Sequence, residues 1–372
     1  GDGEITRRAL NLNLVQSTGI DKEYDGQTTL KNTATKNWNA LTDNDSAGNV
    51  QYATGSNKLV NDGTSFTITS NYRNDGNTAP DKNVRRDSSN NPIDKAIQYR
   101  VTINGDANNY SFDGGTTSAA GGLTLSATGT ITPKDLSGAF EKITKVYDGT
   151  KNVNPADVHF KTGALLAGDN VALGAHTEQF QSENVAGDGT TWPSPGGTVE
   201  KNWINYSGLS LTGTDAGNYN LPSAMRGLGE IKPFEVNPAT HFDFGTITQA
   251  TKIYDGTRKV KRNESDDVQD TKGYIQKADV TVGSTILNLL GNLSVTSATY
   301  DTTPNVNNGT PQGVTYKLTY NGTNPNIQFA PNTTVTATGN GVITKKDVTA
   351  TVKSSVSKVY DATTTLTGVA KD

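Results

Sequence analysis

The chain has 372 residues and a formal net charge of −4, it contains no cysteine, and only 32% of its residues are hydrophobic. The lack of cysteine excludes disulfides, thiolate catalysis and cysteine-ligated zinc, and the slightly acidic balance provides no basic stripe for nucleic acid. The length suits about three domains, and the low apolar content favours small cores in an elongated molecule, whose surface area outgrows its volume.

The first ten residues, GDGEITRRAL, lack the apolar core of a signal peptide, and no apolar run in the chain approaches the length of a transmembrane helix. We therefore expect an internal fragment of a longer polypeptide that does not insert into a membrane. Its composition, rich in Thr, Asn, Gly and Asp, is typical of bacterial surface proteins, because a chain without Cys can be exported without oxidative folding. The expected location is secreted or on the bacterial outer surface.

Three short markers recur along the chain in a fixed order. The first begins with a Gly-x-Ile pattern: GEITRRAL (3–10), GTITPKDL (129–136), GEIKPFEV (229–236) and GVITKKDV (341–348). The second contains a Tyr-Asp pair: DKEYDGQTTL (21–30), TKVYDGTKNV (144–153), TKIYDGTRKV (251–260) and SKVYDATTTL (357–366). The third contains Asn-Tyr: GDANNYSF (105–112), GTDAGNYNL (213–221) and a degenerate copy without that pair, YNGTNPNIQF (320–329). Successive Tyr-Asp pairs lie 106 to 123 residues apart, a domain-sized repeat that predicts tandem homologous modules.

Within the repeats, apolar and polar residues alternate with a period of two. The pattern is clearest in SFTITSNYR (65–73), AIQYRVTIN (96–104) and GVTYKLTYN (313–321). Strict alternation with Thr, Val and Tyr predicts strands that have one buried and one solvated face. We therefore expect an all-β fold of three tandem β-sandwich (Ig-like) modules in an elongated rod. β-Grasp-like modules with one short helix, at 154–169 or 270–280, are the alternative.

The markers also predict the module boundaries. We expect a first module at residues 1–132 with an insertion around 31–95, a second at 133–232, a third at 233–344, and the first strands of an incomplete fourth at 345–372. No Gly/Ser-rich tether separates them, and Pro133 and Pro233 hold the connecting backbone extended. We hypothesise that strands are shared across each boundary, and that three modules in line measure about 110 to 120 Å.

Each residue of the Tyr-Asp-Gly turn has a structural role. Tyr can bury its ring while its hydroxyl reaches a partner, Asp can accept backbone N–H groups, and Gly supplies a positive φ. The motif residues are Tyr24, Asp25, Gly26, Tyr147, Asp148, Gly149, Tyr254, Asp255, Gly256, Tyr360 and Asp361. We expect Tyr147 and Tyr254 to be buried at equivalent positions, with Asp148 and Asp255 bonded to local backbone. Ala362 replaces the glycine of the last copy, so that turn either avoids the left-handed region or is strained.

Catalytic and metal-binding patterns are missing from the sequence. No base or metal ligand recurs with the tyrosines, the three histidines do not cluster, and no G-x-S-x-G, H-E-x-x-H or P-loop pattern occurs. Residues 43–48 begin like a calcium loop, but Thr54 stands where an EF-hand has Glu. The basic cluster at 82–86 lies among Asp, Asn and Ser and is predicted to be a solvated loop. We expect neither enzymatic activity, nor a cofactor, nor a bound metal.

Tryptophans are the candidate ligand-binding residues. Trp38 and Trp192 lie in loop-like sequence, where an exposed indole can stack on a sugar face. Trp203 lies within the alternating segment KNWINYSGL (201–209) and is expected to belong to a core.

The order of the markers resembles the YDG and MBG-type repeat modules of large bacterial surface adhesins, including filamentous haemagglutinin-like exoproteins of the two-partner-secretion kind. The resemblance covers essentially the whole chain. It is most specific in the second module, through Tyr147, Asp148, Gly149, Asp215, Gly217, Asn218 and Tyr219. The first module keeps Asn109 and Tyr110, whereas the third has Pro325 and Asn326 instead. The resemblance implies a repeat region of an exported, surface-associated protein, and it implies no reaction.

Two functions from different classes follow. In the first, the fragment is a non-enzymatic stalk that projects the binding region of an adhesin for host-cell or biofilm adhesion, and its partners are neighbouring repeats of the same polypeptide. In the second, the modules themselves bind a glycan or a protein receptor of the host cell or matrix. Neither function involves nucleic acid. Turn motifs that persist while the loops between them vary favour the stalk.

Overall fold

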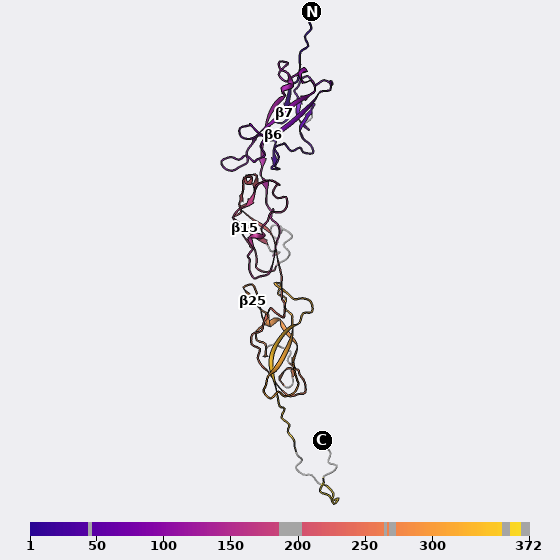
Figure 1. The fold of residues 1–372 in the computed structure, drawn as a ribbon, viewed down its shortest axis with the longest axis vertical. Helices are drawn as coiled ribbons and strands as arrows, with labels where there is room; N and C mark the ends of the chain where they lie inside the picture. Colours follow the sequence, from indigo (N-terminus) through magenta and orange to yellow (C-terminus); the bar gives the residue numbers. More distant parts are fainter. Residues whose placement is uncertain (44–46, 186–202, 264–265, 268–272, 352–357, 366–372) are drawn as a thin grey trace. The chain divides into compact units, whose positions relative to one another are not determined.

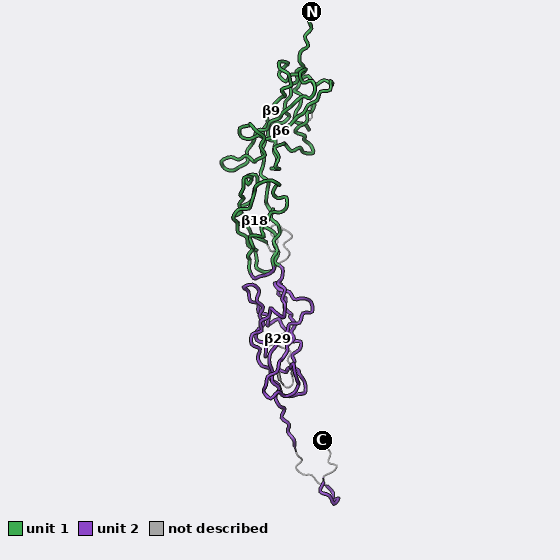
Figure 2. Tube along the Cα trace, viewed as in Figure 1, with its two compact units in different colours: residues 1–145, 150–231 green, residues 146–149, 232–372 purple. Residues whose placement is uncertain are grey.

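The computed structural model describes residues 1–372 except for 44–46, 186–202, 264–265, 268–272, 352–357 and 366–372. The described residues form an all-β fold of several sheets, with short 3-10 turns and no α-helix (Figure 1). No helix in these residues is long and apolar enough to cross a membrane. The chain divides into two compact units, one of residues 1–145 and 150–231 and one of residues 146–149 and 232–372 (Figure 2).

The first sheet is antiparallel and has β7 at its centre. Its strands are β6 (Ser65–Tyr72), β7 (Lys95–Asn104) and β9 (Leu123–Gly129). Ile97, Tyr99 and Val101 of β7 are buried, and the residues between them are less so, which confirms the strand predicted from the alternation at 96–104. A second group contains β2 (Leu12–Leu14), β5 (Gly48–Tyr52) and β4 (Asn37–Thr42), with β5 in the middle. Residues 31–95 thus supply β4, β5 and β6.

The second sheet follows along the chain. Its order is β12 (Ile143–Val146), β18 (Ala224–Lys232), β15 (Trp203–Ser207) and β14 (Thr177–Phe180). β15 pairs antiparallel with both neighbours and buries Trp203, Ile204 and Tyr206. The strands β13 (Ala172–Leu173) and β16 (Leu211–Thr212) form a separate antiparallel pair.

The third sheet lies in the second compact unit. Its order is β21 (Ala250–Ile253), β29 (Val335–Thr344), β27 (Gln312–Tyr320) and β26 (Leu293–Tyr300). β21 runs parallel to β29, and Tyr300, Val314 and Tyr316 are in the core of this unit. Two smaller groups are β20 (Phe242–Asp243) with β24 (Asp279–Val282) and β25 (Thr285–Asn288), and β22 (Lys261–Asn263) with β23 (Asp266–Asp267).

Short parallel pairs involve the Gly-x-Ile segments. They are β1 (Arg8–Ala9) with β8 (Tyr110–Ser111), β10 (Ile131–Thr132) with β3 (Lys22–Glu23), β11 (Lys134–Asp135) with β17 (Tyr219–Asn220), and β19 (Phe234–Glu235) with β28 (Ile327–Gln328). The 3-10 turns are η1 (Ala107–Asn109), η2 (Ala119–Gly121), η3 (Pro155–Asp157), η4 (Ala216–Asn218) and η6 (Leu290–Asn292). β28 keeps the parallel pairing although its repeat lacks the Asn-Tyr pair.

One segment shows how a strand serves two partners in succession. β10 pairs with β3, and two residues later β11 pairs with β17, with Pro133 between them. Ile131 and Leu136 are both fully buried at the two ends of this segment. The predicted continuity without a flexible tether is confirmed here, because both halves of the segment form hydrogen-bonded strands.

The all-β prediction is confirmed, whereas tandem Ig-like sandwiches stay a prediction. The sheets contain two to four strands, and several pairs are parallel, because the Gly-x-Ile strands run alongside their partners in the same direction. Within the predicted helical stretch 154–169 the structure has only the short turn η3. In the last predicted module it describes 345–351 and 358–365 and assigns no strand there, and residues 352–357 and 366–372 lie outside the description.

Candidate functional site

The second marker forms a turn around a buried lysine. In the first copy, the Lys22 ammonium donates to Asp25 Oδ1 at 2.6 Å and to the carbonyls of Gln27 and Thr29 at 2.7 and 2.9 Å. The Lys22 side chain is only 3% exposed. Burial lowers the pKa of Lys22, and the hydrogen bond and charge of Asp25 partly offset that effect. An ammonium with this many acceptors can be buried without the large cost of an unpaired charge.

The third copy repeats this arrangement. Lys252 is equally buried and donates to Asp255 Oδ1 at 2.7 Å and to the carbonyl of Thr257 at 2.5 Å. Burial acts to raise the pKa of Asp255, but hydrogen bonds from Lys252, Thr257 and Lys261 outweigh it and hold that pKa well below its usual range. Asp255 Oδ1 also accepts the backbone N–H of Thr257 at 2.9 Å, as expected for a turn-forming carboxylate.

The other two copies preserve the lysine contacts. Lys145 donates to the carbonyls of Thr150 and Asn152 at 2.7 and 3.1 Å. Lys358 donates to Asp361 Oδ1 and to the Thr363 carbonyl, both at 2.6 Å. In all four copies the ammonium therefore reaches the carbonyl five residues further along the chain. We call these segments the lysine turns, at residues 22–29, 145–152, 252–257 and 358–365.

An aromatic ring covers the ammonium in three of the lysine turns. The pairs are Lys22 with Tyr72 at 5.4 Å, Lys145 with Phe180 at 5.3 Å, and Lys252 with Tyr300 at 5.6 Å, measured from Nζ to the ring centroid. Each ring belongs to the last residue of a strand, in β6, β14 and β26 respectively. A cation over an aromatic face contributes about 0.5 to 2 kcal/mol. These contacts attach each turn to the sheet beside it.

Sequence reasoning assigned no role to these lysines. The signal was present, because Lys stands two residues before Tyr in every copy of the marker. Lysine side chains are seldom fully buried, and the acceptors that permit it here are mostly backbone carbonyls, which carry no sequence signature.

All four turns place the residue after Asp in the left-handed region. The φ angles are 76° at Gly26, 75° at Gly149, 74° at Gly256 and 64° at Ala362. Of the two alternatives for the last copy, the structure has the strained one, because a Cβ in this region is unfavourable.

The four tyrosines differ in burial. Tyr24 and Tyr147 are 2% and 4% exposed, whereas Tyr254 is 38% and Tyr360 90% exposed. The expectation that Tyr147 and Tyr254 are equivalently buried is therefore wrong for Tyr254. The cause lies outside the turn itself, since the local lysine contacts are the same: Tyr24 is covered by residues from farther along the chain.

Tyr24 belongs to a buried cluster around one carboxylate. The hydroxyls of Tyr24 and Tyr219 donate to Asp169 Oδ2 at 2.7 and 2.8 Å, and Lys82 Nζ contacts Oδ1 at 2.8 Å. The two tyrosine rings pack edge to face, with their centroids 5.6 Å apart. We call Tyr24, Lys82, Asp169 and Tyr219 the Asp169 cluster. It joins the first lysine turn to the third marker of the second repeat.

The charges of the Asp169 cluster compensate one another. Burial raises the pKa of Tyr24 to about 12, and the hydrogen bond to Asp169 adds to it; burial likewise raises the pKa of Tyr219 to about 12. Burial acts to raise the pKa of Asp169, but hydrogen bonds from Lys82 and both tyrosines outweigh it and lower that pKa. Both phenols are therefore neutral and the carboxylate is charged near neutral pH.

The prediction that residues 82–86 form a solvated loop is confirmed only in part, because Asn83 and Arg85 are exposed whereas Lys82, Val84 and Arg86 are half-buried. Besides the Lys82 contact, the Val84 N–H donates to Asn218 Oδ1 at 2.9 Å, and Arg86 Nη2 donates to the Gly217 carbonyl at 2.9 Å. Asn218 itself is buried. The loop is ordered because its polar groups pair with the Asn-Tyr turn, which lies more than 100 residues away in the sequence.

Of the two predicted ligand-binding tryptophans, the structure describes Trp38. Trp38 lies in β4 rather than in a loop, half-buried against the core, and its indole N–H donates to the Lys31 carbonyl at 3.1 Å. Trp192 lies outside the described residues. Trp203 is buried in β15.

Within the described ranges, no group of three or more His, Cys, Asp or Glu side chains is placed to hold a metal ion. Asp43, from the calcium-like segment, forms an exposed ion pair with Lys58 at 2.5 Å, and residues 44–46 lie outside the description. In the Asp169 cluster, three donors occupy the carboxylate. Such an arrangement holds segments of the chain together.

The comparison with known families agrees with this geometry. Among curated proteins, no sequence matches the chain. Residues 132–226 match the YDG domain family. This range contains the lysine turn at Tyr147, together with Asp169 and the Asn218–Tyr219 pair. The chain therefore contains a YDG domain at residues 132–226.

Proposed function

We propose that this chain is a non-enzymatic repeat region, a stalk, of a bacterial surface or secreted adhesin, and that it projects a binding region for host-cell or biofilm adhesion. The observation that carries the proposal is the Asp169 cluster. There the side chains of two recurring markers are used to join one repeat to the next, with Tyr24 from the first repeat and Tyr219 from the second on the same carboxylate. The YDG domain at residues 132–226 supports the proposal.

In this proposal each repeat is a module, with boundaries at residues 1–132, 133–232 and 233–344, and the first two modules are joined stiffly. Two features support a stiff joint between them. The segment around Pro133 is hydrogen-bonded on both of its sides, through β10 and β11. The loop at 82–86 adds contacts to Gly217 and Asn218. A spacer requires such joints, because a flexible tether would let the modules fold back on one another.

Small-angle X-ray scattering of the 372-residue protein tests the stalk. Three modules in line predict a maximum dimension of about 110 Å, whereas a compact chain of this length would measure about 70 Å. The variant Asp169→Asn is expected to broaden the distribution of distances by loosening the first joint. Asp361→Asn, in an exposed lysine turn, is the matched control and should leave the profile unchanged. A maximum near the compact value for the unmodified protein contradicts the proposal.

A glycan-array screen of the same protein separates the stalk from a receptor-binding function. The stalk predicts no specific binding by these residues. Specific binding that Trp38→Ala abolishes, with the fold retained by circular dichroism, would favour the receptor instead. The partial burial of Trp38 and its hydrogen bond to the Lys31 carbonyl weigh against that result.

A further inference from the structure

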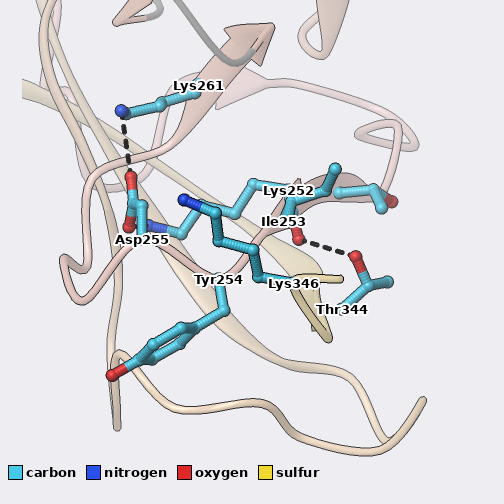
Figure 3. A pocket seen from close by; sticks show the side chains of 8 residues that line it. Lys252, Ile253, Tyr254, Asp255, Lys261, Thr344 and Lys346 are labelled. Atoms are coloured by element: carbon cyan, nitrogen blue, oxygen red, sulfur yellow. Dashed lines mark hydrogen bonds and ion pairs between the residues drawn. The ribbon is translucent and has the colours of Figure 1, made fainter. Parts of the chain in front are cut away.

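The lysine turn of the third sheet lies at an open pocket. The pocket has a volume of about 320 Å³ and is lined by residues 251–255, Lys261, Thr344 and Lys346 (Figure 3). The Tyr254 ring points away from the paired Lys252 and Asp255 side chains. Tyr254 and Ile253 are 38% and 41% exposed. Large apolar side chains are thus exposed beside a turn whose polar groups are already paired.

In the two preceding lysine turns the tyrosine and the glycine are covered, with Tyr24 and Tyr147 at 2% and 4% exposure, although Val146, which matches Ile253, is 53% exposed. A Cβ added to Gly26 would meet Leu166 Cδ1 at 3.3 Å. One added to Gly149 would clash with the Thr285 side chain, at the start of β25. One added to Gly256 would have no atom of the described residues within 4 Å. Two turns of the same geometry are therefore each capped by residues of the next repeat, and the third is not.

Residues 345–348, which follow the last strand of the third sheet, form no strand pair among the described residues. In three Gly-x-Ile segments, the last residue is buried, and the two residues before it pair in parallel with a short strand that lies within a third marker. These buried residues are Leu10, Leu136 and Val236, at 0%, 0% and 2% exposure. The fourth segment, residues 345–348, is not assigned as a strand, and its Val348 is 88% exposed. This segment has the same sequence pattern as the other three, but it has no partner strand in the described part of the chain.

We propose that residues 251–256 and 344–348, the Tyr254 acceptor surface, bind another YDG-type module whose Asn-Tyr strand is unpaired. Residues 346–347 would pair in parallel with that strand, as β11 pairs with β17. Val348 would enter the core of the incoming module. A side chain of that module would cover Gly256. The incoming module would offer Tyr254 a hydrogen-bond acceptor, as Asp169 does for Tyr24. This inference rests on the proposed stalk and names the partner of one joint.

A second copy of this chain is not the expected occupant. The strands within its third markers, β8, β17 and β28, are each paired already with a Gly-x-Ile segment of the same chain. To dock, a copy would have to exchange one of these strands. The protein is therefore expected to be monomeric in sedimentation velocity at micromolar concentration, and self-association that Val348→Asp abolishes would overturn the choice of partner.

The test supplies the missing partner in the same polypeptide. Residues 137–231 are appended after Val348, in place of 349–372, so that residues 345–348 take the position that 133–136 have before the native segment. Hydrogen exchange at Lys346 and Val348 is expected to slow by about tenfold or more, because the equivalent amides Phe234 and Val236 are hydrogen-bonded. Nitration of Tyr254, followed by mass spectrometry, should fall toward the low level of Tyr147.

Val348→Asp is the matched control. Because Val348 is exposed in the 372-residue protein, the substitution should leave its hydrogen exchange and Tyr254 nitration unchanged. In the extended protein the same substitution places a carboxylate in a core, so it should abolish both the slowed exchange and the reduced nitration. Unchanged Tyr254 nitration with a folded appended segment contradicts the proposal. An appended segment that stays unfolded also counts against it, because residues 345–348 provide the strand that it lacks. Neither readout depends on the scattering or glycan results, so the stalk and the acceptor surface can fail separately.

Discussion

Tyr24 and Tyr219 donate their hydroxyls to the same oxygen of Asp169 and pack edge to face. One tyrosine comes from a Tyr-Asp-Gly turn and the other from an Asn-Tyr turn of the following repeat. The two recurring motifs are therefore partners in space, and each depends on the other for burial.

Asp169→Asn is expected to lower the free energy of unfolding by about 2 to 4 kcal/mol in urea denaturation, because the carboxylate that accepts from Lys82 and from both tyrosine hydroxyls is only 2% exposed and loses its charge. The transition to follow is that of residues 1–231, monitored by hydrogen exchange at β17. Asp361→Asn, whose side chain is half-exposed, should leave the free energy of unfolding nearly unchanged, because solvent screens its ion pair with Lys358. Equal effects of the two substitutions would contradict a special role for the Asp169 cluster.

Gly149→Ala and Gly256→Ala form a matched pair. Both glycines have the same backbone conformation, so each substitution should cost about 1 to 2 kcal/mol of unfolding free energy from strain. Gly149→Ala should cost more, because its Cβ would also clash with Thr285, whereas Gly256 has no neighbour within 4 Å in the described structure. Thermal unfolding followed by circular dichroism checks this order, and a Gly256→Ala loss equal to or larger than that of Gly149→Ala would contradict it.

Lys252→Met tests the buried ammonium of the lysine turn. Methionine keeps the length of the side chain but removes the ammonium from the Thr257 carbonyl, and it leaves Asp255 with the Lys261 ammonium at 3.0 Å and the N–H and hydroxyl of Thr257. We expect a loss of about 2 to 3 kcal/mol in the unfolding free energy of the second compact unit. Lys358→Met, in a more exposed turn, is the control and should have a small effect. An unchanged unfolding free energy in Lys252→Met would show that the ion pair is dispensable.

The alkaline stability of the first compact unit depends on Tyr24 and Tyr219. Their pKa values are raised from 10.0 to about 12 in the folded protein, so the stabilisation is complete below pH 10 and is lost as the pH rises from about 10 to 12. Unfolding midpoints in urea should fall across this window. Tyr24→Phe should make the fall shallower, because one shifted phenol is removed, while a residual fall remains from buried Tyr72, Tyr99 and Tyr206, whose pKa values are also raised by burial. An equally steep fall in the variant would contradict the assignment.

The sequence predicted the features that depend on local pattern. The strand at 96–104 has a strict alternation because one of its faces is buried, and β7 occupies this range. The continuity around Pro133 followed from the absence of a tether and from the restricted backbone before proline. Both predictions needed only neighbouring residues.

Long-range pairing accounts for what sequence reasoning missed. Lys82 and Asp169 are 87 residues apart, and their loops contain ordinary polar residues, so their contact had no local signature. The burial of Tyr24 and the exposure of Tyr254 follow from different surroundings rather than from different motifs. Copies of the same motif thus predict the same turn, but they do not predict which residues from elsewhere in the chain pack against it.

The paired segment around Pro133 also has a mechanical consequence. The segment follows β9 and contains the two short strands β10 and β11. β10 runs parallel to Lys22–Glu23, and β11 runs parallel to Tyr219–Asn220. A pull along the backbone would slide each strand lengthwise past its partner, so that its hydrogen bonds are loaded together in shear and do not unzip one at a time. The buried side chains of Ile131 and Leu136 would resist the same sliding. Under tension, this segment would hold longer than its few hydrogen bonds suggest.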